Sequence, residues 1–325
     1  MSGFISARRT EERVREATTF PFRFGVQSRS AGPRGPWLET VRRVEALGYD
    51  TLMWPDHFVR GFEPVAAMAA AAIATERLRL SGFVFDNDFR HPVVLAMSAG
   101  SIDILSDGRL ELGIGAGWLK EEYDLSGIPF DPPGVRIARL EEAVHLLKLL
   151  LSGERTSFAG EFYTVDGLQI PPAPVQKPWP PLVIGGGSPK ILSLAAREAD
   201  IVGITTRALP DGSKDAADMT AAATARKIDW VREAAGDRFA RIELNTICPT
   251  VEITDDRAAA AERIAADLPV SAAEVLDSPA VLLGTVDQIV ATLEERRERY
   301  GFSYIVILEP AMEAFAPVVA RLAGR

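Results

Sequence analysis

The chain has only three histidines, and one of them, His57, directly follows Asp56 in the stretch LMWPDHFVRG (residues 52–61). The preceding run, residues 51–54, is uncharged and is typical of a buried strand that ends at a proline. A histidine can take or give a proton near pH 7, and a neighbouring carboxylate can fix its orientation or contact a ligand itself. The same residues also suit a turn that holds a capped, half-buried histidine, so residue type alone leaves both interpretations open.

The other two histidines favour structural roles. His91 precedes Pro92 at the start of a predicted helix, where capping is favoured over catalysis. His145 lies inside a long amphipathic segment, which indicates a position on a helix rather than in a site. No histidine and carboxylate pair has the spacing of metal ligands, so we expect no metal site.

Two glycine-rich segments could accommodate a ligand. GIGAGW (113–118) lacks the last glycine of a dinucleotide fingerprint, but its bare backbone would let a flat ligand approach closely. IGGGSPKIL (184–192) ends a predicted strand and opens a helix, whose free N–H groups suit a phosphate or a carboxylate. A glycine turn without a ligand stays open as the alternative. DNDFRHP (86–92) adds polar groups after another strand, and an ordinary solvated loop is its alternative.

These segments need a scaffold that brings strand ends together. Strands are predicted over 22–27, 51–54, 77–85, 108–117, 181–187, 200–205, 241–253 and 302–310. Helices are predicted over 35–50, 63–75, 91–106, 134–153, 188–199, 212–236 and 285–301, with a further helix at the C-terminus. This alternation favours a closed (β/α)8 TIM barrel with insertions in the βα loops over an open doubly wound sheet, and it puts chemistry where strands end. Residues 154–180 break the alternation with a small hairpin and a proline-rich excursion.

Composition limits the partners and the compartment. The 325 residues are 47% hydrophobic and 25% charged, and no linker divides them, so we expect one domain over 21–325 after a poorly anchored arm, residues 1–20. A net charge of −9 argues against nucleic acid or an anionic membrane as the main partner. The single cysteine, Cys248, excludes an internal disulfide. With no apolar run long enough to span a bilayer, we expect a soluble, cytoplasmic protein.

The chain resembles the luciferase-like monooxygenase superfamily of flavin and deazaflavin barrels. The segments that carry the resemblance include FRFGVQ, YDTLMWPDHF, FVFDNDFRHPVVLAMSAGSIDILSDGRLELGIGAGWLKEEY and PPLVIGGGSPKILSLAAREADIVGIT. They cover residues 22–205 well, and residues 281–309 match less closely. Within the superfamily the chain is most similar to coenzyme F420-dependent oxidoreductases of actinobacteria.

The resemblance implies a ring cofactor across the carboxyl ends of the strands, with Asp56 and His57 as the catalytic pair near its reactive centre. It implies a cis peptide bond at Phe83–Val84 within a bulge after the third strand. The cofactor's phosphate would lie at the segment 185–188. The cofactor contacts that it implies are Trp54, Phe83, Val84, Asn87, Gly115, Ala116, Gly185, Gly186, Gly187 and Ser188.

One position departs from the family. Sugar-phosphate dehydrogenases of this group carry a catalytic glutamate where this chain has Trp118, so glucose 6-phosphate is not expected as the substrate. Trp118 suggests instead an apolar wall over the substrate side of the ring. Residues 154–180 and 206–240 are expected to shape the substrate pocket.

The leading hypothesis is an oxidoreductase that transfers hydride between coenzyme F420 and a small organic substrate. An FMN-dependent monooxygenase of the two-component kind, which receives FMNH2 from a separate reductase, is the alternative. Carbon at ring position 5 makes the deazaflavin an obligate hydride carrier, whereas nitrogen in FMN permits oxygen chemistry. A non-catalytic flavin-fold binding protein also stays open. The resemblance further implies a homodimer, and a separate flavin or F420 reductase as a possible partner.

Overall fold

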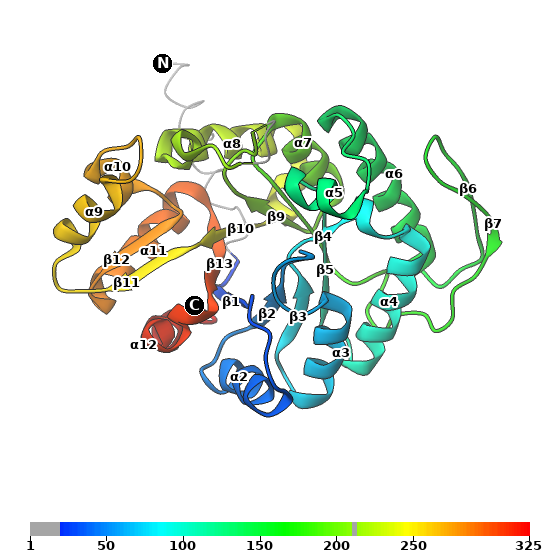
Figure 1. Cartoon of the computed structure of the whole chain (residues 1–325), viewed down its shortest axis with the longest axis horizontal. Coiled ribbons are helices and arrows are strands. Elements are labelled where there is room, and N and C mark those ends of the chain that lie inside the picture. The colour runs from blue at the N-terminus through cyan, green and yellow to red at the C-terminus, as the bar shows by residue number, and fades with distance from the viewer. Residues whose placement is uncertain (1–19, 210–212) are drawn as a thin grey trace, which may run out of the picture.

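Eight parallel strands form a closed barrel in the computed structural model, which describes residues 20–209 and 213–325 (Figure 1). The barrel strands are β1 (Arg23–Gln27), β2 (Thr51–Trp54), β3 (Arg79–Gly82), β5 (Leu110–Gly115), β8 (Leu182–Gly186), β9 (Ile201–Ile204), β10 (Glu243–Cys248) and β13 (Phe302–Leu308). They lie in the order β3-β2-β1-β13-β10-β9-β8-β5, and pairing of β3 with β5 closes the ring. The predicted (β/α)8 barrel is confirmed. The arm expected over residues 1–20 lies outside the described residues, apart from Phe20.

Helices surround the barrel, as Figure 1 shows. They are α2 (Arg34–Ala46), α3 (Pro64–Ala74), α4 (Pro92–Leu105), α5 (Lys120–Ser126), α6 (Pro133–Leu151), α7 (Pro189–Glu198), α8 (Ala221–Ala235), α9 (Arg257–Ala265), α10 (Ala272–Asp277), α11 (Val286–Tyr300) and α12 (Met312–Leu322). The apolar residues at helical spacing in α2, namely Trp37, Val41 and Val44, are buried as their periodicity predicts. Within the described part of the chain, none of these helices has both the length and the apolar character needed to cross a membrane.

The structure departs from the predicted elements in four places. The strand predicted over 241–253 divides into β10 and β11 (Thr250–Ile253), and β11 pairs with β12 (Val281–Gly284) in a separate small sheet covered by α9 and α10. The prediction missed β12 and the short helix α5. Within the range predicted as a helix, 212–236, α8 begins only at Ala221. The strand predicted over 77–85 is interrupted between β3 and β4 (Phe85–Asp86).

The interruption after β3 is the bulge that the resemblance implied. The peptide bond between Phe83 and Val84 is cis, so that prediction is confirmed. The predicted hairpin is also present, as β6 (Thr156–Ala159) paired antiparallel with β7 (Thr164–Leu168). It lies at the far edge of the molecule in Figure 1, away from the barrel strands.

The amino end of the barrel is filled by a buried ion network. The carboxylate of Glu111 on β5 accepts hydrogen bonds from Arg23 at 2.6 Å and from Arg79 at 2.7 Å. The hydroxyl of Tyr304 donates to its other oxygen at 3.0 Å. Burial alone would raise the pKa of Glu111, but the two arginines outweigh it and lower that pKa. This network closes one end of the barrel and leaves the carboxyl end of the strands for a site.

Candidate active site

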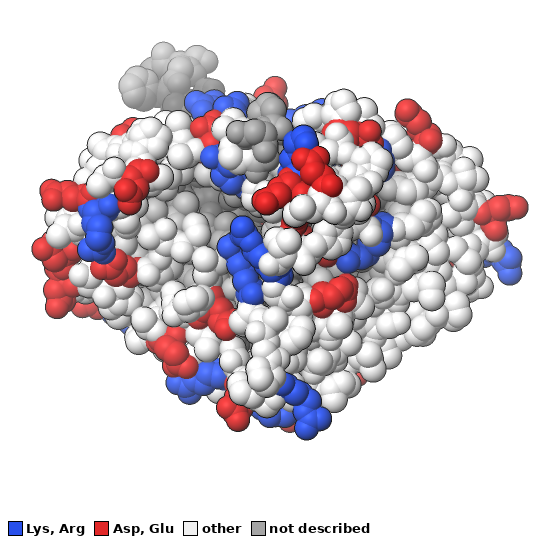
Figure 2. All heavy atoms as spheres, in the orientation of Figure 1, with Lys and Arg blue, Asp and Glu red and all other residues white. Residues whose placement is uncertain are grey.

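A cavity of about 640 Å³ opens at the carboxyl end of the barrel strands. Among its lining residues are many of those predicted from the sequence: Asp56, His57, Phe83, Val84, Gly115, Ala116, Trp118, Gly185, Gly186, Gly187 and Ser188. Figure 2 shows this face of the molecule, with a hollow near its centre. The strand ends therefore bring these residues together, as expected for a barrel of this type.

His57 is oriented by a glutamate that the sequence analysis missed. Its Nδ1 atom lies 2.7 Å from Oε2 of Glu122, on the short helix α5. Glu122 is only 2% exposed and lines the cavity. An ionised carboxylate can only accept a hydrogen bond, so Nδ1 carries the proton in that state and Nε2 is free to act on a ligand. The only sequence signal was an acidic pair, Glu121-Glu122, a few residues beyond GIGAGW.

Asp56 lines the cavity, but its carboxylate binds other groups. It accepts hydrogen bonds from the guanidinium of Arg90, at 2.5 Å and 3.1 Å, and from the backbone N–H of Asp86 at 3.0 Å. Glu122, rather than Asp56, therefore orients the imidazole of His57. Although Asp56 and His57 are adjacent in the chain, their side chains contact different partners. Asp56 instead anchors the loop after β3 to the loop after β2.

A third carboxylate of the lining, Asp86, has a raised pKa. The pKa of Asp86 is raised to about 7, mainly by burial and further by the negative charges of Asp88 and Asp56. The hydroxyl of Tyr123 opposes this shift by donating to the two carboxylate oxygens at 2.9 Å and 2.8 Å. Asp86 therefore changes its charge near neutral pH.

The glycines of GIGAGW make room for the bulge. A Cβ atom on Gly113 would lie 2.0 Å from the carbonyl oxygen of Gly82, and one on Gly115 would lie 2.7 Å from a methyl group of Val84. Close approach of a ligand was the predicted reason for these glycines, whereas the structure shows that the chain itself requires them. Gln27 holds the bulge from the other side, since its amide donates to the carbonyl oxygen of Phe83 at 3.2 Å.

The segment 185–188 lies where β8 ends and α7 begins. Ser188 precedes the first turn of α7, and its side chain makes no capping hydrogen bond, so the backbone N–H groups of that turn remain available. Gly186 and Gly187 are tightly enclosed by Ile191 and by the backbone of Arg207. Gly185 has room, because the nearest atom to a Cβ there would be the carbonyl oxygen of Gly203 at 3.6 Å.

Trp118 forms part of the cavity wall. Its ring meets the imidazole of His57 edge to face, with 6.0 Å between the ring centroids. The ammonium group of Lys214 lies 4.4 Å from the centroid of the indole. Part of Lys214 is exposed, yet crowding around its ammonium group and the charge of Lys227 lower the pKa of Lys214 to about 8.

Two predicted cofactor contacts do not reach the cavity. Met53 points into the barrel, so the next residue of β2, Trp54, points outward and packs against Trp37. Asn87 donates to the hydroxyl of Tyr163 at 3.2 Å in a separate small cavity. We therefore leave Trp54 and Asn87 out of the candidate site.

The expectation for residues 154–180 was also wrong, since none of them lines the cavity. Residues 130–133, beside α5, take that place, and among the described residues of the segment 206–240 only those near its start contribute. The other two histidines lie apart from the cavity lining. His91 caps α4 by accepting from the N–H of Val93, as predicted, and His145 lies 3.3 Å from Glu198 on the surface.

Two buried oxygen atoms of the lining lack a hydrogen-bond partner within the described residues. They are Oε1 of Glu122 and Oδ1 of Asn245. Buried polar atoms are rarely left unpaired, because an unmade hydrogen bond costs about 1–3 kcal/mol. Both residues belong to the lining of the same cavity, although the two oxygen atoms themselves are buried.

The sequence pattern of the luciferase-like monooxygenases matches residues 15–273. The chain belongs to this family. An F420-dependent glucose-6-phosphate dehydrogenase of Intrasporangium calvum is 37% identical to it over 179 residues, which make up 52% of this chain and 53% of that protein. The chain thus spans about half the length of this luciferase-like relative.

Solved structures share the luciferase-like fold over nearly the whole chain. The coenzyme F420-dependent tetrahydromethanopterin reductase from Methanopyrus kandleri has a TM-score of 0.74 at 17% identity, covering 93% of this chain and 100% of that one. An F420-dependent secondary alcohol dehydrogenase in complex with an F420-acetone adduct has a TM-score of 0.70 at 18% identity, covering 92% and 97%. At these identities the likeness shows the shared fold.

Proposed function

We propose that the protein is an oxidoreductase that transfers hydride between coenzyme F420 and a small organic substrate. Membership of the luciferase-like family and the names of its relatives support the cofactor class. The observation that carries the proposal is the His57–Glu122 pair in the wall of a cavity at the carboxyl end of the barrel. A proton must accompany hydride when a carbonyl and an alcohol interconvert, and this pair can exchange it.

The lining residues fit a flat ring with a phosphate tail. Gly185 and Gly203 offer side-chain-free backbone on the neighbouring strands β8 and β9, on which a ring can lie closely. The N-terminus of α7, after Gly187, would hold the phosphate through backbone N–H groups. When bound, F420 supplies a carbon that carries hydride.

Each catalytic side chain then has a separate task. His57 holds or releases the proton at Nε2, while Glu122 fixes the ring by its contact with Nδ1 and stabilises the imidazolium. Trp118 covers one side of the cavity with an apolar surface and limits the access of water. Asp56 positions the loops through Arg90 and does not contact the imidazole.

Turnover of F420 with purified protein tests the proposal. The absorbance of oxidised F420 would be followed as it falls with a panel of small alcohols, and as it rises when reduced F420 is mixed with the matching aldehydes, with His57→Asn and the exposed-site control Glu121→Gln in parallel. We expect turnover with the wild-type protein and with Glu121→Gln, and about 10²–10⁴-fold less with His57→Asn, because an amide cannot titrate near neutral pH. Wild-type turnover by His57→Asn, at an unchanged melting temperature, would show that the histidine is structural. The homodimer and a separate reductase remain predictions.

A further inference from the structure

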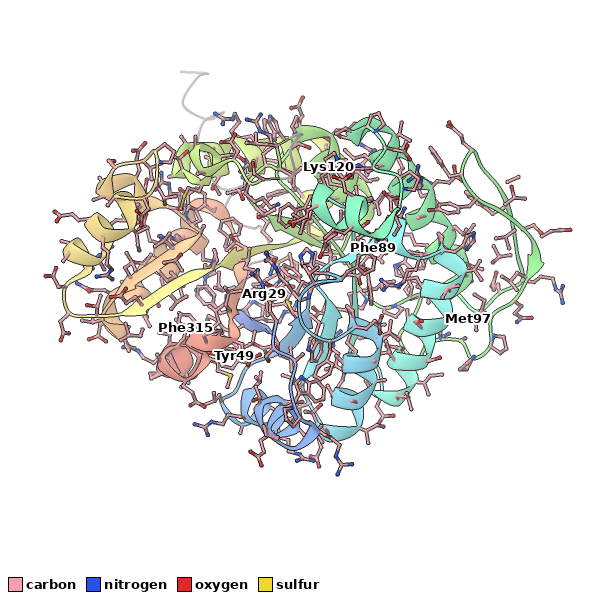
Figure 3. The ribbon with its side chains drawn as sticks, viewed as in Figure 1. Arg29, Tyr49, Phe89, Met97, Lys120 and Phe315 are labelled. Atoms are coloured by element: carbon pink, nitrogen blue, oxygen red, sulfur yellow. The ribbon has the colours of Figure 1, made fainter. Side chains whose placement is uncertain are left out.

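Arg29 lies beside the bulge at the cavity edge, held there by a short relay of hydrogen bonds. It follows β1 by two residues and lines the cavity. Its Nε donates to Oε1 of Gln27 at 3.0 Å, and Nε2 of Gln27 donates to the carbonyl oxygen of Phe83 at 3.2 Å. Figure 3 places Arg29 near the middle of the face that carries the cavity. The relay leaves the terminal nitrogens of the guanidinium free to bind a ligand.

No carboxylate neutralises Arg29 within the described residues. The acidic side chains of the cavity lining have other partners: Asp56 binds Arg90, Asp86 binds Tyr123, Glu122 binds His57 and Asp131 binds Arg139. Glu309, after the neighbouring strand β13, accepts hydrogen bonds from Ser28 and Ser30 instead. An arginine without a counter-charge at a cavity edge is ready to bind an anion.

A second arginine strengthens the positive charge at this edge. The loop after β2 packs on the loop after β1 so closely that a Cβ on Gly61 would lie 3.2 Å from the carbonyl oxygen of Arg29. This contact brings Arg60, the preceding residue, next to Arg29. Arg29 is exposed at the cavity edge, and its partial burial together with the charge of Arg60 lowers its pKa, as expected for two neighbouring cations. Figure 2 shows basic side chains beside the central hollow.

The barrel separates Arg29 from the segment proposed to hold the cofactor's phosphate. In the strand order β1-β2-β3-β5-β8, four steps around an eight-stranded ring take β1 to the opposite side, at β8. The glycine segment 185–188 ends β8, whereas Arg29 follows β1. Lys214, another cation of the lining, follows β9 and so lies nearer the β8 side. A ring cofactor that has its phosphate at β8 leaves the anion site at β1 for a different group.

We propose that Arg29, assisted by Arg60, binds an anionic oxygen group of the substrate, and that the substrate is therefore an organic acid or a phosphate ester. This inference rests on the proposed function. The planar guanidinium suits both carboxylate and phosphate because it can donate two parallel hydrogen bonds. Trp118 supplies an apolar surface elsewhere in the cavity, so the body of the substrate is apolar.

Binding of small aromatic probes to the F420-loaded protein tests the inference. Benzoate and phenyl phosphate carry the anion, and benzamide is the neutral match for benzoate. Calorimetric titrations would compare the wild type with Arg29→Gln, Arg29→Lys and the control Arg42→Gln, an exposed arginine on α2. The F420-loaded form is needed because a free anion could otherwise bind at the N-terminus of α7. The affinity of each variant for F420 is measured first.

We expect at least one of the two anions to bind the wild type more tightly than benzamide does. Arg29→Gln should weaken the binding of that anion at least tenfold and leave the affinities for benzamide and F420 unchanged. Arg29→Lys should recover part of the lost affinity. Arg42→Gln should bind every probe as the wild type does. Equal anion affinity in wild type and Arg29→Gln would overturn the inference. A tenfold loss of F420 affinity in Arg29→Gln would also overturn it, by showing that the arginine serves the cofactor. Failure of the wild type to bind F420 would instead contradict the proposed function.

Discussion

The imidazole of His57 and the carboxylate of Glu122 lie 2.7 Å apart although 65 positions separate them in the chain. The contact joins the loop after β2 to the short helix α5, so the geometry of the imidazole depends on an element beyond the barrel strands. Glu122 is buried and its second oxygen has no partner among the described residues. The pair therefore has the arrangement of an oriented acid–base group that faces a ligand site.

Replacing Glu122 with glutamine should distinguish its effect on the imidazole of His57 from any effect on the binding of F420. An amide oxygen can accept a hydrogen bond from Nδ1–H, but it cannot stabilise an imidazolium by charge, so kcat should fall about 10²-fold. The affinity for F420 should stay within about twofold, because the proposed ring and phosphate contacts lie elsewhere. Steady-state kinetics with Glu121→Gln as the exposed neighbour supplies the control. An unchanged kcat in a folded Glu122→Gln variant would remove the pair from the mechanism.

Gly185 offers a cleaner test of the proposed ring site than its neighbour. A side chain on Gly186 would run into Ile191, so a loss of binding there would be confounded with a loss of stability. The Cβ of Gly185→Val would meet nothing closer than 3.6 Å in the cavity lining, so this variant should weaken F420 binding at least tenfold at a nearly unchanged melting temperature. Gly32→Val, in open space, is the control. Full F420 affinity in Gly185→Val would show that the ring does not lie against β8.

The titration of Asp86 should appear in the pH dependence of stability. Because folding raises its pKa to about 7, the folded state holds this proton more tightly than the unfolded state does. The resulting stabilisation is present at pH values below the unfolded pKa, about 4, and is lost as pH rises toward 7. Asp86→Asn should therefore flatten the fall in melting temperature between pH 4 and pH 7, whereas the exposed Asp124→Asn should not. Identical slopes in the wild type and Asp86→Asn would contradict this assignment.

Glu111 should be essential for stability and irrelevant to ligand chemistry. Removing its charge would leave Arg79 without an ion-pair partner among the described residues and Arg23 with Glu243 alone, and breaking such a largely buried pair costs about 3 kcal/mol, the low end for buried pairs. Urea denaturation of Glu111→Gln should show a free energy of unfolding lower by that amount, against no change in the exposed-site variant Glu294→Gln. A wild-type denaturation midpoint for Glu111→Gln would mean that the network does not stabilise the barrel.

The barrel could be predicted because the sequence patterns that indicate its strands and helices lie within each segment of the chain. Alternating apolar runs and amphipathic segments mark strands and helices whatever lies far away in the chain, and the residues at the strand ends follow from the fold. Trp54 was misplaced because the position of a residue in a strand does not by itself say which face points inward, and Met53 takes the inner face. Gly113 and Gly115 were explained by a ligand, although the backbone of Gly82 and the side chain of Val84 in the bulge are what require them.

The site contacts that the sequence did not reveal are those between distant loops. Glu122 lies on a helix of only 7 residues, too short for periodicity to mark. Arg29 belongs to a polar loop, and the composition of this loop is that of an ordinary solvated segment. Two features of the structure mark Arg29 as a site residue: its hydrogen bond to Gln27 and its lack of an acidic partner among the described residues. β12 was missed because its four residues pair with β11 outside the barrel.

Equilibrium binding of F420 against FMN is the most direct measurement of the central claim, that this cavity holds a deazaflavin for hydride transfer. Purified protein would be titrated with each oxidised cofactor under the same conditions, with Gly185→Val as the variant expected to lose the site. The account predicts a Kd for F420 at least tenfold below that for FMN, and weakened F420 binding in Gly185→Val. Tighter binding of FMN than of F420 would contradict the account and favour a flavin-dependent monooxygenase.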